Sequence, residues 1–417
     1  MSKIVVNGGK PLSGTVSVHG AKNAVLPILA ATVMAGGVHT IHNCPELSDV
    51  GITAEILKEL GAKVTRCGDS LTVDTSDEMK SYIPERLMRK LRSSIIFMGA
   101  VLARKKCAKI SAPGGCELGP RPIDLHIKAL RELGAKIEEE HGYLICTADD
   151  LKGAHIHLDI PSVGATENIM LAACAAKGTT VISNAAREPE IEDLAKYLCA
   201  MGAKIRGAGT STVTIEGSCN LHPAEHRVMP DRIVAATYLC AAAATGGNIT
   251  VTDVCTEHLC AVLAVLSDCG CQIIKEKDRV SLSAPEIIKS PGSIKTMPYP
   301  GFPTDAQSLF LAMLAKSEGT TLITETIFES RFKAAGELLR MGAKISVDSR
   351  VAVVKGMEKL SGACVTAADL RGGAALVVAA LAAEGRTEIN SPEFIYRGYE
   401  NFEQNLKTLG ADIAYEG

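Results

Sequence analysis

The sequence predicts an α/β protein made of six repeated α/β units, which divide into two similar lobes. Three observations predict this class. A helix-end signature recurs six times at a spacing of roughly 70 residues. An Ala-rich apolar helix followed by a small residue and a short strand recurs equally often. The 417 residues are 47% hydrophobic and 22% charged, so the chain has enough apolar side chains for a large core.

The helix-end signature places a glycine between the last apolar residue of a helix and a small residue. Before the first copy, Ile52, Ile56 and Leu60 fall at helical spacing after Ser48, which is a good helix cap, and Gly61 supplies a left-handed stop. Short alternating segments broken by a turn follow, which predicts strand, turn, strand. The six copies lie at residues 60–63, 133–136, 201–204, 269–272, 341–344 and 409–412.

The second motif predicts helices that are buried on most faces, because their residues are apolar all round. A solenoid is disfavoured, since the repeats lack a short period and a polar capping unit. We therefore expect two closed lobes of three units each, with helices inside and short sheets outside, and a seam within residues 217–232. Copies of the motif lie at residues 30–41, 95–110, 169–182, 233–251, 309–323 and 374–389.

Charge and composition exclude several classes of partner. The formal net charge of -3 provides no basic field for nucleic acid or an acidic membrane surface. The start of the chain has no signal-peptide pattern, and no apolar run reaches the roughly 18 residues that span a bilayer. The 14 cysteines show no regular spacing, which is typical of reduced thiols. We therefore expect a cytoplasmic protein that binds neither nucleic acid nor membrane.

The segment 112–126 is the most informative for chemistry. Its glycines at 114 and 119 have the spacing of a phosphate-binding loop, but Pro120-Arg121 replaces the Lys-Ser/Thr pair, so nucleotide hydrolysis is disfavoured. Cys116 lies in this glycine-rich loop near Arg121, a setting that favours an accessible, activated thiol. It is predicted to be a proton donor or a nucleophile, with a packed core thiol as the alternative. Arg121, between two prolines, is predicted to clamp an anion.

Two helix starts offer further candidates. Lys22 opens an Ala-rich helix, where its ammonium and the positive helix end can share an anion; alternatively, Asn23 is the N-cap and Lys22 points into solvent. Thr304 and Gln307 have the spacing of a capping box, so Asp305 either favours the helix dipole or acts on a substrate hydroxyl as base or orienting group.

Single arginines near unit junctions are by default solvated surface charges, and they converge on phosphates only if the lobes close. These are Arg92, Arg331, Arg371 and Arg397. A cysteine- and histidine-rich stretch matches none of the paired C-x-x-C zinc patterns, so no metal is expected. It contains Cys255, His258, Cys260, Cys269 and Cys271.

Together these motifs resemble those of the UDP-N-acetylglucosamine 1-carboxyvinyltransferases, a family of enolpyruvyl transferases, over essentially the whole chain. The resemblance implies an inside-out α/β barrel with residues 1–21 and 230–417 in one lobe and 22–229 in the other. The residues that carry it lie at 22–24, 115–126, 162–166, 186–190, 230–232, 302–305 and 397–400.

The resemblance implies that the enzyme moves the enolpyruvyl group of phosphoenolpyruvate to the 3'-hydroxyl of UDP-N-acetylglucosamine, the first committed step of peptidoglycan synthesis. Phosphate leaves from a tetrahedral intermediate, and no metal or organic cofactor is required. A cytoplasmic monomer that serves cell-wall formation, and with it cell shape, the cell cycle and cell division, is expected.

Roles are carried over by position. Cys116 corresponds to the thiol that protonates phosphoenolpyruvate, can bond covalently to it, and is alkylated by fosfomycin. Lys22, Arg121 and Arg397 correspond to residues that hold phosphoenolpyruvate, and Asp305 to one that faces the sugar hydroxyl. The remaining expected substrate contacts are Asn23, Arg92, Pro122, Ile123, Asp124, Leu125, Ser162, Val163, Gly164, Ile327, Arg331 and Arg371.

Two alternatives stay open on the sequence alone. An enolpyruvylshikimate-phosphate synthase shares the fold and the phosphoenolpyruvate chemistry, although the Cys116 loop argues against it. A repeat-built protein that binds UDP-sugars without turnover is the alternative from a different class.

Overall fold

The computed structural model describes residues 2–111, 123–217 and 220–417, and these divide into two compact units. The terminal unit holds residues 2–19 and 230–417. The central unit holds the described residues between 20 and 229. Each unit has a hydrophobic core of its own.

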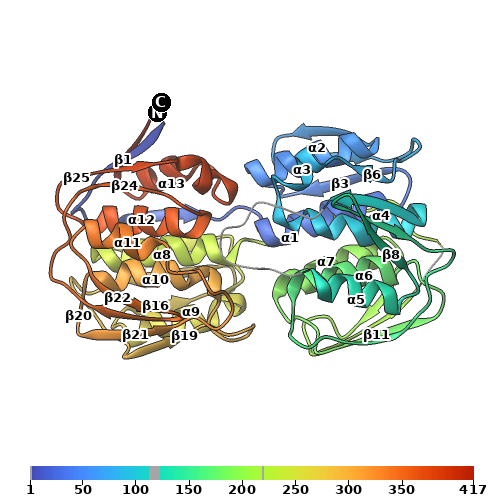
Figure 1. Cartoon of the computed structure of the whole chain (residues 1–417). Helices are drawn as coiled ribbons and strands as arrows, with labels where there is room; N and C mark the ends of the chain where they lie inside the picture. Colours follow the sequence, from blue (N-terminus) through green and yellow to red (C-terminus); the bar gives the residue numbers. More distant parts are fainter. Residues whose placement is uncertain (1, 112–122, 218–219) are drawn as a thin grey trace. The chain divides into compact units, whose positions relative to one another are not determined.

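Three Ala-rich helices form the middle of each unit (Figure 1). In the terminal unit α8, α10 and α12 contact one another, and in the central unit α4 contacts both α1 and α6. Every residue of α12 is buried, which is possible because its sequence is apolar on all faces apart from one arginine. These helices are α1 (Lys22–Ala31), α4 (Phe97–Lys105), α6 (Val163–Ala173), α8 (Arg232–Thr245), α10 (Thr304–Ala315) and α12 (Leu370–Ala382).

A second set of helices ends at the recurring glycines. All six glycines have positive φ, between 87° and 111°, so the predicted left-handed stops are confirmed. They are Gly61, Gly134, Gly202, Gly270, Gly342 and Gly410, which follow α2 (Ser48–Leu60), α5 (Asp124–Glu132), α7 (Pro189–Ala200), α9 (Cys260–Asp268), α11 (Ala334–Arg340) and α13 (Phe402–Thr408). Shorter helices are α3 (Glu85–Met88), η1 (Thr32–Met34), η2 (Arg92–Ile96), η3 (Thr256–Leu259) and η4 (Pro392–Arg397).

Each repeat also contributes to a four-stranded sheet of constant topology. The first two strands of each sheet are parallel, and the remaining pairs are antiparallel. Buried and less buried residues alternate along strands such as β15, because one sheet face covers the helices.

In the central unit the sheets are β14 (Glu225–Arg227), β3 (Val38–His42), β5 (Ser70–Asp74), β4 (Lys63–Cys67); β6 (Tyr82–Ile83), β7 (Cys107–Ser111), β9 (Tyr143–Thr147), β8 (Lys136–Glu140); and β10 (His155–His157), β11 (Thr179–Ser183), β13 (Thr212–Glu216), β12 (Lys204–Arg206). In the terminal unit they are β2 (Ser13–Ser17), β15 (Asn248–Thr252), β17 (Arg279–Ser283), β16 (Gln272–Lys275); β19 (Ser293–Lys295), β21 (Thr320–Thr324), β23 (Val351–Lys355), β22 (Lys344–Asp348); and β24 (Cys364–Thr366), β25 (Arg386–Asn390), β1 (Lys3–Asn7), β26 (Asp412–Glu416). A two-stranded sheet joins β18 (Ile288–Lys289) to β20 (Ser317–Glu318).

In each unit, strands from the two ends of that unit's sequence pair across repeats and close the unit. In the central unit the last strand, β14, pairs with the first strand of the unit's first repeat, β3. In the terminal unit β2 pairs with β15, and β1 lies between β25 and β26. The two ends of the chain therefore meet in one sheet (Figure 1). The predicted inside-out α/β barrel, with helices within and short sheets outside, is the observed architecture.

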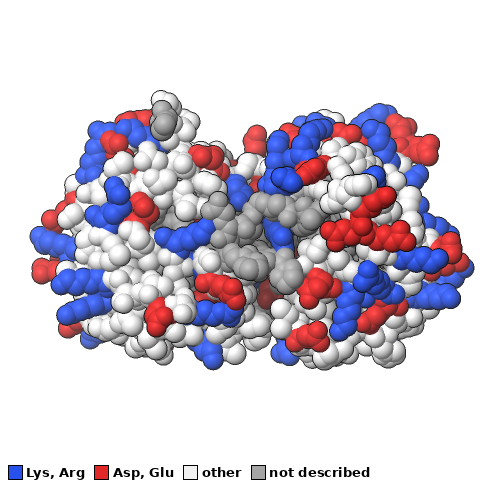
Figure 2. All heavy atoms as spheres, viewed as in Figure 1, with Lys and Arg blue, Asp and Glu red and all other residues white. Residues whose placement is uncertain are grey.

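The surface carries charges of both signs. Figure 2 shows Lys and Arg interspersed with Asp and Glu over each unit on the face that it presents. Within the described ranges, no helix combines the length and apolar character that crossing a bilayer requires. The twelve cysteines described are free thiols, and no group of three or more His, Cys, Asp or Glu side chains in the same part of the chain is placed to hold a metal ion.

Candidate active site

The predicted site residues fall into two groups, one in each unit. Cys116, Arg121 and Pro122 lie outside the described residues. The central unit holds Lys22, Asn23, Arg92, Ile123, Asp124, Leu125, Ser162, Val163 and Gly164. The terminal unit holds Asp305, Ile327, Arg331, Arg371 and Arg397.

In the terminal unit, Asp305 lies between two buried arginines. It is the second residue of α10, and its Oδ1 accepts a hydrogen bond from Arg331 Nη2 at 2.8 Å. Its Oδ2 accepts one from Arg371 Nη2 at 3.2 Å. Each arginine side chain is 3% exposed, whereas that of Asp305 is 26% exposed. The default prediction of solvated arginines is therefore wrong for these two, because both are buried inside the unit and pair with the same carboxylate.

Arg371 is held by local and distant groups together. It is the second residue of α12, whose N-cap Asp369 accepts hydrogen bonds from the Arg371 and Gly372 N–H groups. Burial is the largest single effect and lowers the pKa of Arg371, but Asp305, Tyr399 and Asp231 together outweigh burial and raise that pKa above its ordinary value. The guanidinium therefore stays charged in the core.

Glu325 organises the start of α10 in place of the predicted capping box. Its Oε2 accepts a hydrogen bond from the Thr304 hydroxyl at 2.9 Å, and Oε1 accepts from Ile327 N at 2.7 Å and Phe328 N at 3.0 Å. The Thr304–Gln307 capping box is wrong, since the N-cap of α10 is Pro303 and this hydroxyl bonds to a fully buried carboxylate 21 residues away. Sequence reasoning missed Glu325. Its signal is a lone acid directly after a strand.

Arg397 ends η4 and is partly buried. It comes two residues before Tyr399, which is fully buried and receives a hydrogen bond from Arg371 Nη1 at 3.3 Å. Asp305, Arg331 and Arg371 form a group that we call the Asp305 cluster. The tetrapeptide 397–400, singled out in the sequence, therefore contacts this cluster through its tyrosine.

In the central unit, Lys22 is anchored at the start of α1. Its Nζ lies 2.8 Å from Oδ2 of Asp49, whose side chain is fully buried. The residue preceding α1, Ala21, takes the N-cap position, so the alternative of Asn23 as N-cap and Lys22 in solvent is wrong. An ammonium thus lies at the positive end of a helix, which suits an anionic ligand.

A buried amide ties together three other segments of the central unit. The Asn168 side-chain oxygen accepts from Gly99 N at 2.7 Å, so its Nδ2 donates to Ile95 O at 3.1 Å and to His126 Nδ1 at 3.0 Å. The neutral His126 ring therefore carries its proton on Nε2. Burial, and next the charge of Arg92, lower the pKa of His126 to about 4.

This arrangement brings the starts of α5 and α6 together. A Cβ built on Gly164 would lie 3.3 Å from His126 Cε1, so only glycine leaves ordinary space beside the ring. Ser162 is the N-cap of α6 and accepts a hydrogen bond from Ala165 N. Ile123, Asp124 and Leu125 thus lie close in the fold to Ser162, Val163 and Gly164, as a shared ligand site requires.

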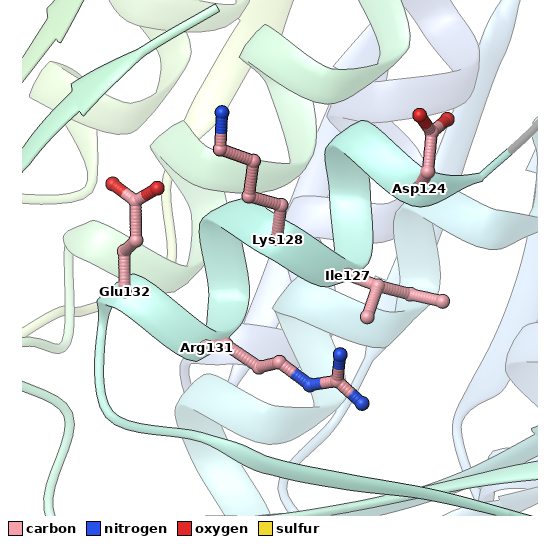
Figure 3. A pocket seen from close by; sticks show the side chains of 5 residues that line it. All are labelled: Asp124, Ile127, Lys128, Arg131 and Glu132. Atoms are coloured by element: carbon pink, nitrogen blue, oxygen red, sulfur yellow. The ribbon is translucent and has the colours of Figure 1, made fainter.

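A surface hollow of ≈ 630 Å³ borders α5 (Figure 3). The described residues that line it all project from this one helix. They are Asp124, Ile127, Lys128, Arg131 and Glu132. Only Asp124 is a predicted site residue, and the hollow lies in the other unit from Asp305. The candidate site therefore consists of the polar residues around Asp305 in the terminal unit and around Lys22 and His126 in the central unit, and not of this hollow.

Comparison with known proteins places these clusters in context. The family described as EPSP synthase (3-phosphoshikimate 1-carboxyvinyltransferase) matches residues 6–406. The chain is 54% identical over 413 residues to "UDP-N-acetylglucosamine 1-carboxyvinyltransferase 2" of Caldanaerobacter subterraneus subsp. tengcongensis, covering 99% of both chains. It is 49% identical over 418 residues to a protein of the same name from Carboxydothermus hydrogenoformans, again covering 99% of both.

Solved structures agree with the architecture. The enolpyruvyl transferase NikO from Streptomyces tendae superimposes with a TM-score of 0.89 at 27% identity, covering 99% of this chain and 98% of that one. An EPSP synthase from Acinetobacter baumannii superimposes with a TM-score of 0.76 at 19% identity over 100% of both chains, a similarity of fold.

Proposed function

Because the chain belongs to the family of UDP-N-acetylglucosamine 1-carboxyvinyltransferases, we propose that it transfers the enolpyruvyl group of phosphoenolpyruvate to the 3'-hydroxyl of UDP-N-acetylglucosamine. The observation that carries the proposal is the 54% identity to a relative of that name over 99% of both chains. The reaction releases phosphate and is the first committed step of peptidoglycan synthesis. Both substrates are small, soluble anions, which suits an enzyme of the cytoplasm.

Asp305 acts on the sugar hydroxyl in this proposal. Both of its carboxylate oxygens already accept hydrogen bonds from guanidinium groups, which stabilises the charged form. Complete proton abstraction would weaken both pairs. The geometry therefore favours an Asp305 that orients the hydroxyl and accepts its hydrogen bond while the C–O bond forms.

Cationic side chains bind the second substrate, phosphoenolpyruvate, in this proposal. Lys22, Arg121 and Arg397 hold the phosphate and carboxylate of phosphoenolpyruvate, with help from Asn23 and Arg92. The Lys22 ammonium at the start of α1 supports this role, since the helix dipole and the ammonium favour the same charge. These charges stabilise the anion that develops during addition.

The bonding changes balance without a redox partner. The hydroxyl oxygen bonds to C2 of phosphoenolpyruvate and gives up its proton to the phosphate group, while C3 takes a proton, which Cys116 supplies as general acid. The resulting tetrahedral intermediate then returns a proton from C3 to the Cys116 thiolate and loses hydrogen phosphate from C2. No atom changes its oxidation state overall, so the reaction requires no electron carrier.

The uridine diphosphate part is assigned to the starts of α5 and α6. At these starts lie Ile123, Asp124, Leu125, Ser162, Val163 and Gly164, and the same part of the substrate is assigned to Arg121 and Pro122, which precede Ile123 in the sequence. The packing of His126 beside Gly164 supports this assignment, because it holds the two helix starts together. In the terminal unit, Ile327 donates its N–H to Glu325, so its carbonyl and side chain are the groups offered to a ligand.

The test is phosphate release by the purified protein given phosphoenolpyruvate with UDP-N-acetylglucosamine or with 3-phosphoshikimate. We expect release with the UDP-sugar alone. Release only with 3-phosphoshikimate would assign the chain to the other branch of the family. Silence with both acceptors, together with calorimetric binding of the UDP-sugar, would instead support a binding protein.

A further inference from the structure

Tyr399 links the Asp305 cluster to a different helix of the terminal unit. The residue is 1% exposed. Its hydroxyl oxygen lies 3.3 Å from Arg371 Nη1 and 2.8 Å from the hydroxyl of Thr237 on α8. The ring also lies 5.6 Å from the Arg371 guanidinium carbon, within cation–π distance.

The donor and the acceptor of each hydrogen bond between Arg371, Tyr399 and Thr237 can be assigned from the groups present. Thr237 donates its hydroxyl proton to Ile233 O at 2.7 Å, so it can only accept from Tyr399. Tyr399 therefore donates to Thr237. An arginine only donates, so Arg371 donates to the Tyr399 oxygen. The hydroxyl of Tyr399 thus uses its one proton on Thr237 and faces Arg371 as an acceptor.

Arg371 depends on this acceptor for its orientation. Its Nη2 donates to Asp305 and its Nη1 to Tyr399, while its buried Nε has no hydrogen-bond partner among the described residues. Two hydrogen bonds on different nitrogens prevent the guanidinium from turning in its plane. Without the tyrosine oxygen, Asp305 alone would hold a buried group that already lacks one partner.

We infer that Tyr399 is a positioning residue, whose hydroxyl orients the Arg371 guanidinium and through it the Asp305 carboxylate against the acceptor hydroxyl. This inference rests on the proposed function for its effect on turnover. A misplaced carboxylate costs rate even where substrate binding is unchanged, because reaction requires close alignment of the reacting atoms. Tyr399 itself is not assigned a contact with substrate.

The decisive variant is Tyr399→Phe, which removes the oxygen and retains the ring. Tyr238→Phe is its matched control. Tyr238 lies on α8, is fully buried, packs against Phe402 as Tyr399 does, and accepts one hydrogen bond from Asn405 Nδ2 at 3.0 Å. We expect Tyr399→Phe to lower kcat about tenfold, the scale of one hydrogen bond to a charged group, and to leave KM for the UDP-sugar within about twofold. Tyr238→Phe should lower Tm to a similar extent without changing kcat.

A double-mutant cycle separates positioning from general destabilisation. Arg371→Lys lowers kcat by itself, and Tyr399→Phe should add almost nothing in that background, because its effect passes through the guanidinium. Two outcomes would overturn the inference. One is that the effects on kcat multiply independently, and the other is that Tyr238→Phe reduces kcat as much as Tyr399→Phe.

Side-chain NMR of ¹⁵N-arginine provides a readout that does not depend on turnover. Arg371→Lys identifies the Arg371 signals. We expect hindered rotation of this guanidinium in the wild type and in Tyr238→Phe, and faster rotation in Tyr399→Phe. Unchanged rotation would refute the positioning role. A wild type without transferase activity would instead refute the proposed function, while this measurement would still decide the role of Tyr399.

Discussion

Replacing Asp305 by alanine tests whether its carboxylate stabilises the two buried arginines. Arg331 and Arg371, each 3% exposed, would lose their charged partner. Removing one member of a buried ion pair costs about 3–5 kcal/mol, and because Asp305 is 26% exposed we expect about 2–4 kcal/mol. For a unit of this size that corresponds to a decrease in Tm of roughly 5–15 °C.

The measurement is thermal unfolding followed by far-UV circular dichroism, since the chain has no tryptophan to report fluorescence. Glu384→Ala in the same unit is the control. Glu384 pairs with Lys359 at 2.8 Å, but both side chains are 63% exposed, so we expect its loss to leave Tm nearly unchanged. A similar Tm for both variants would refute the reasoning that burial makes the Asp305 pairs important.

The same Asp305→Ala variant tests the chemistry. Turnover should fall by about a hundredfold or more, as for loss of a group that aligns the reacting hydroxyl. Calorimetric binding of UDP-N-acetylglucosamine at a temperature below the transition should persist. Unimpaired turnover in a folded variant would remove Asp305 from the mechanism.

Three further predictions concern separate parts of the molecule. Fosfomycin should add its mass to Cys116, as peptide mapping would locate it; a tag on another residue, or inhibition that survives Cys116→Asp, contradicts the loop assignment. Burial lowers the pKa of His126 from 6.5 to about 4, so between pH 4 and pH 6.5 the unfolded chain binds more protons than the folded chain. We therefore expect up to about 3 kcal/mol of folding stability to be lost as pH falls from 6.5 to 4. Urea unfolding of His126→Gln should show a smaller loss over that window, and an identical pH dependence would show that His126 contributes nothing. Glu325→Gln leaves one acceptor for three donors, so we expect about 1–3 kcal/mol lower stability and a higher KM for the UDP-sugar; an unchanged melt and KM would exclude Glu325 as the organiser of this loop.

Features that depend on neighbouring residues could be predicted from the sequence. The six glycine stops follow from local backbone sterics, and all six have the expected positive φ. The repeats predicted the fold class because each unit uses the same alternation of apolar helix, strand and helix. The expected role of Cys116 remains a prediction.

Features that depend on partners far along the chain could not be predicted. The rule for helix caps failed at Thr304, because its hydroxyl bonds to Glu325, and the rule for exposed arginines failed at Arg371, because Asp305 lies 66 residues away in sequence. The bond between Thr237 and Tyr399 joins residues separated by 162 positions. No local pattern marks such pairs. The sequence alone thus determined the repeating framework and its helix ends. Only the tertiary structure decided which polar groups meet, because a buried charge requires a partner, and packing brings that partner from another repeat.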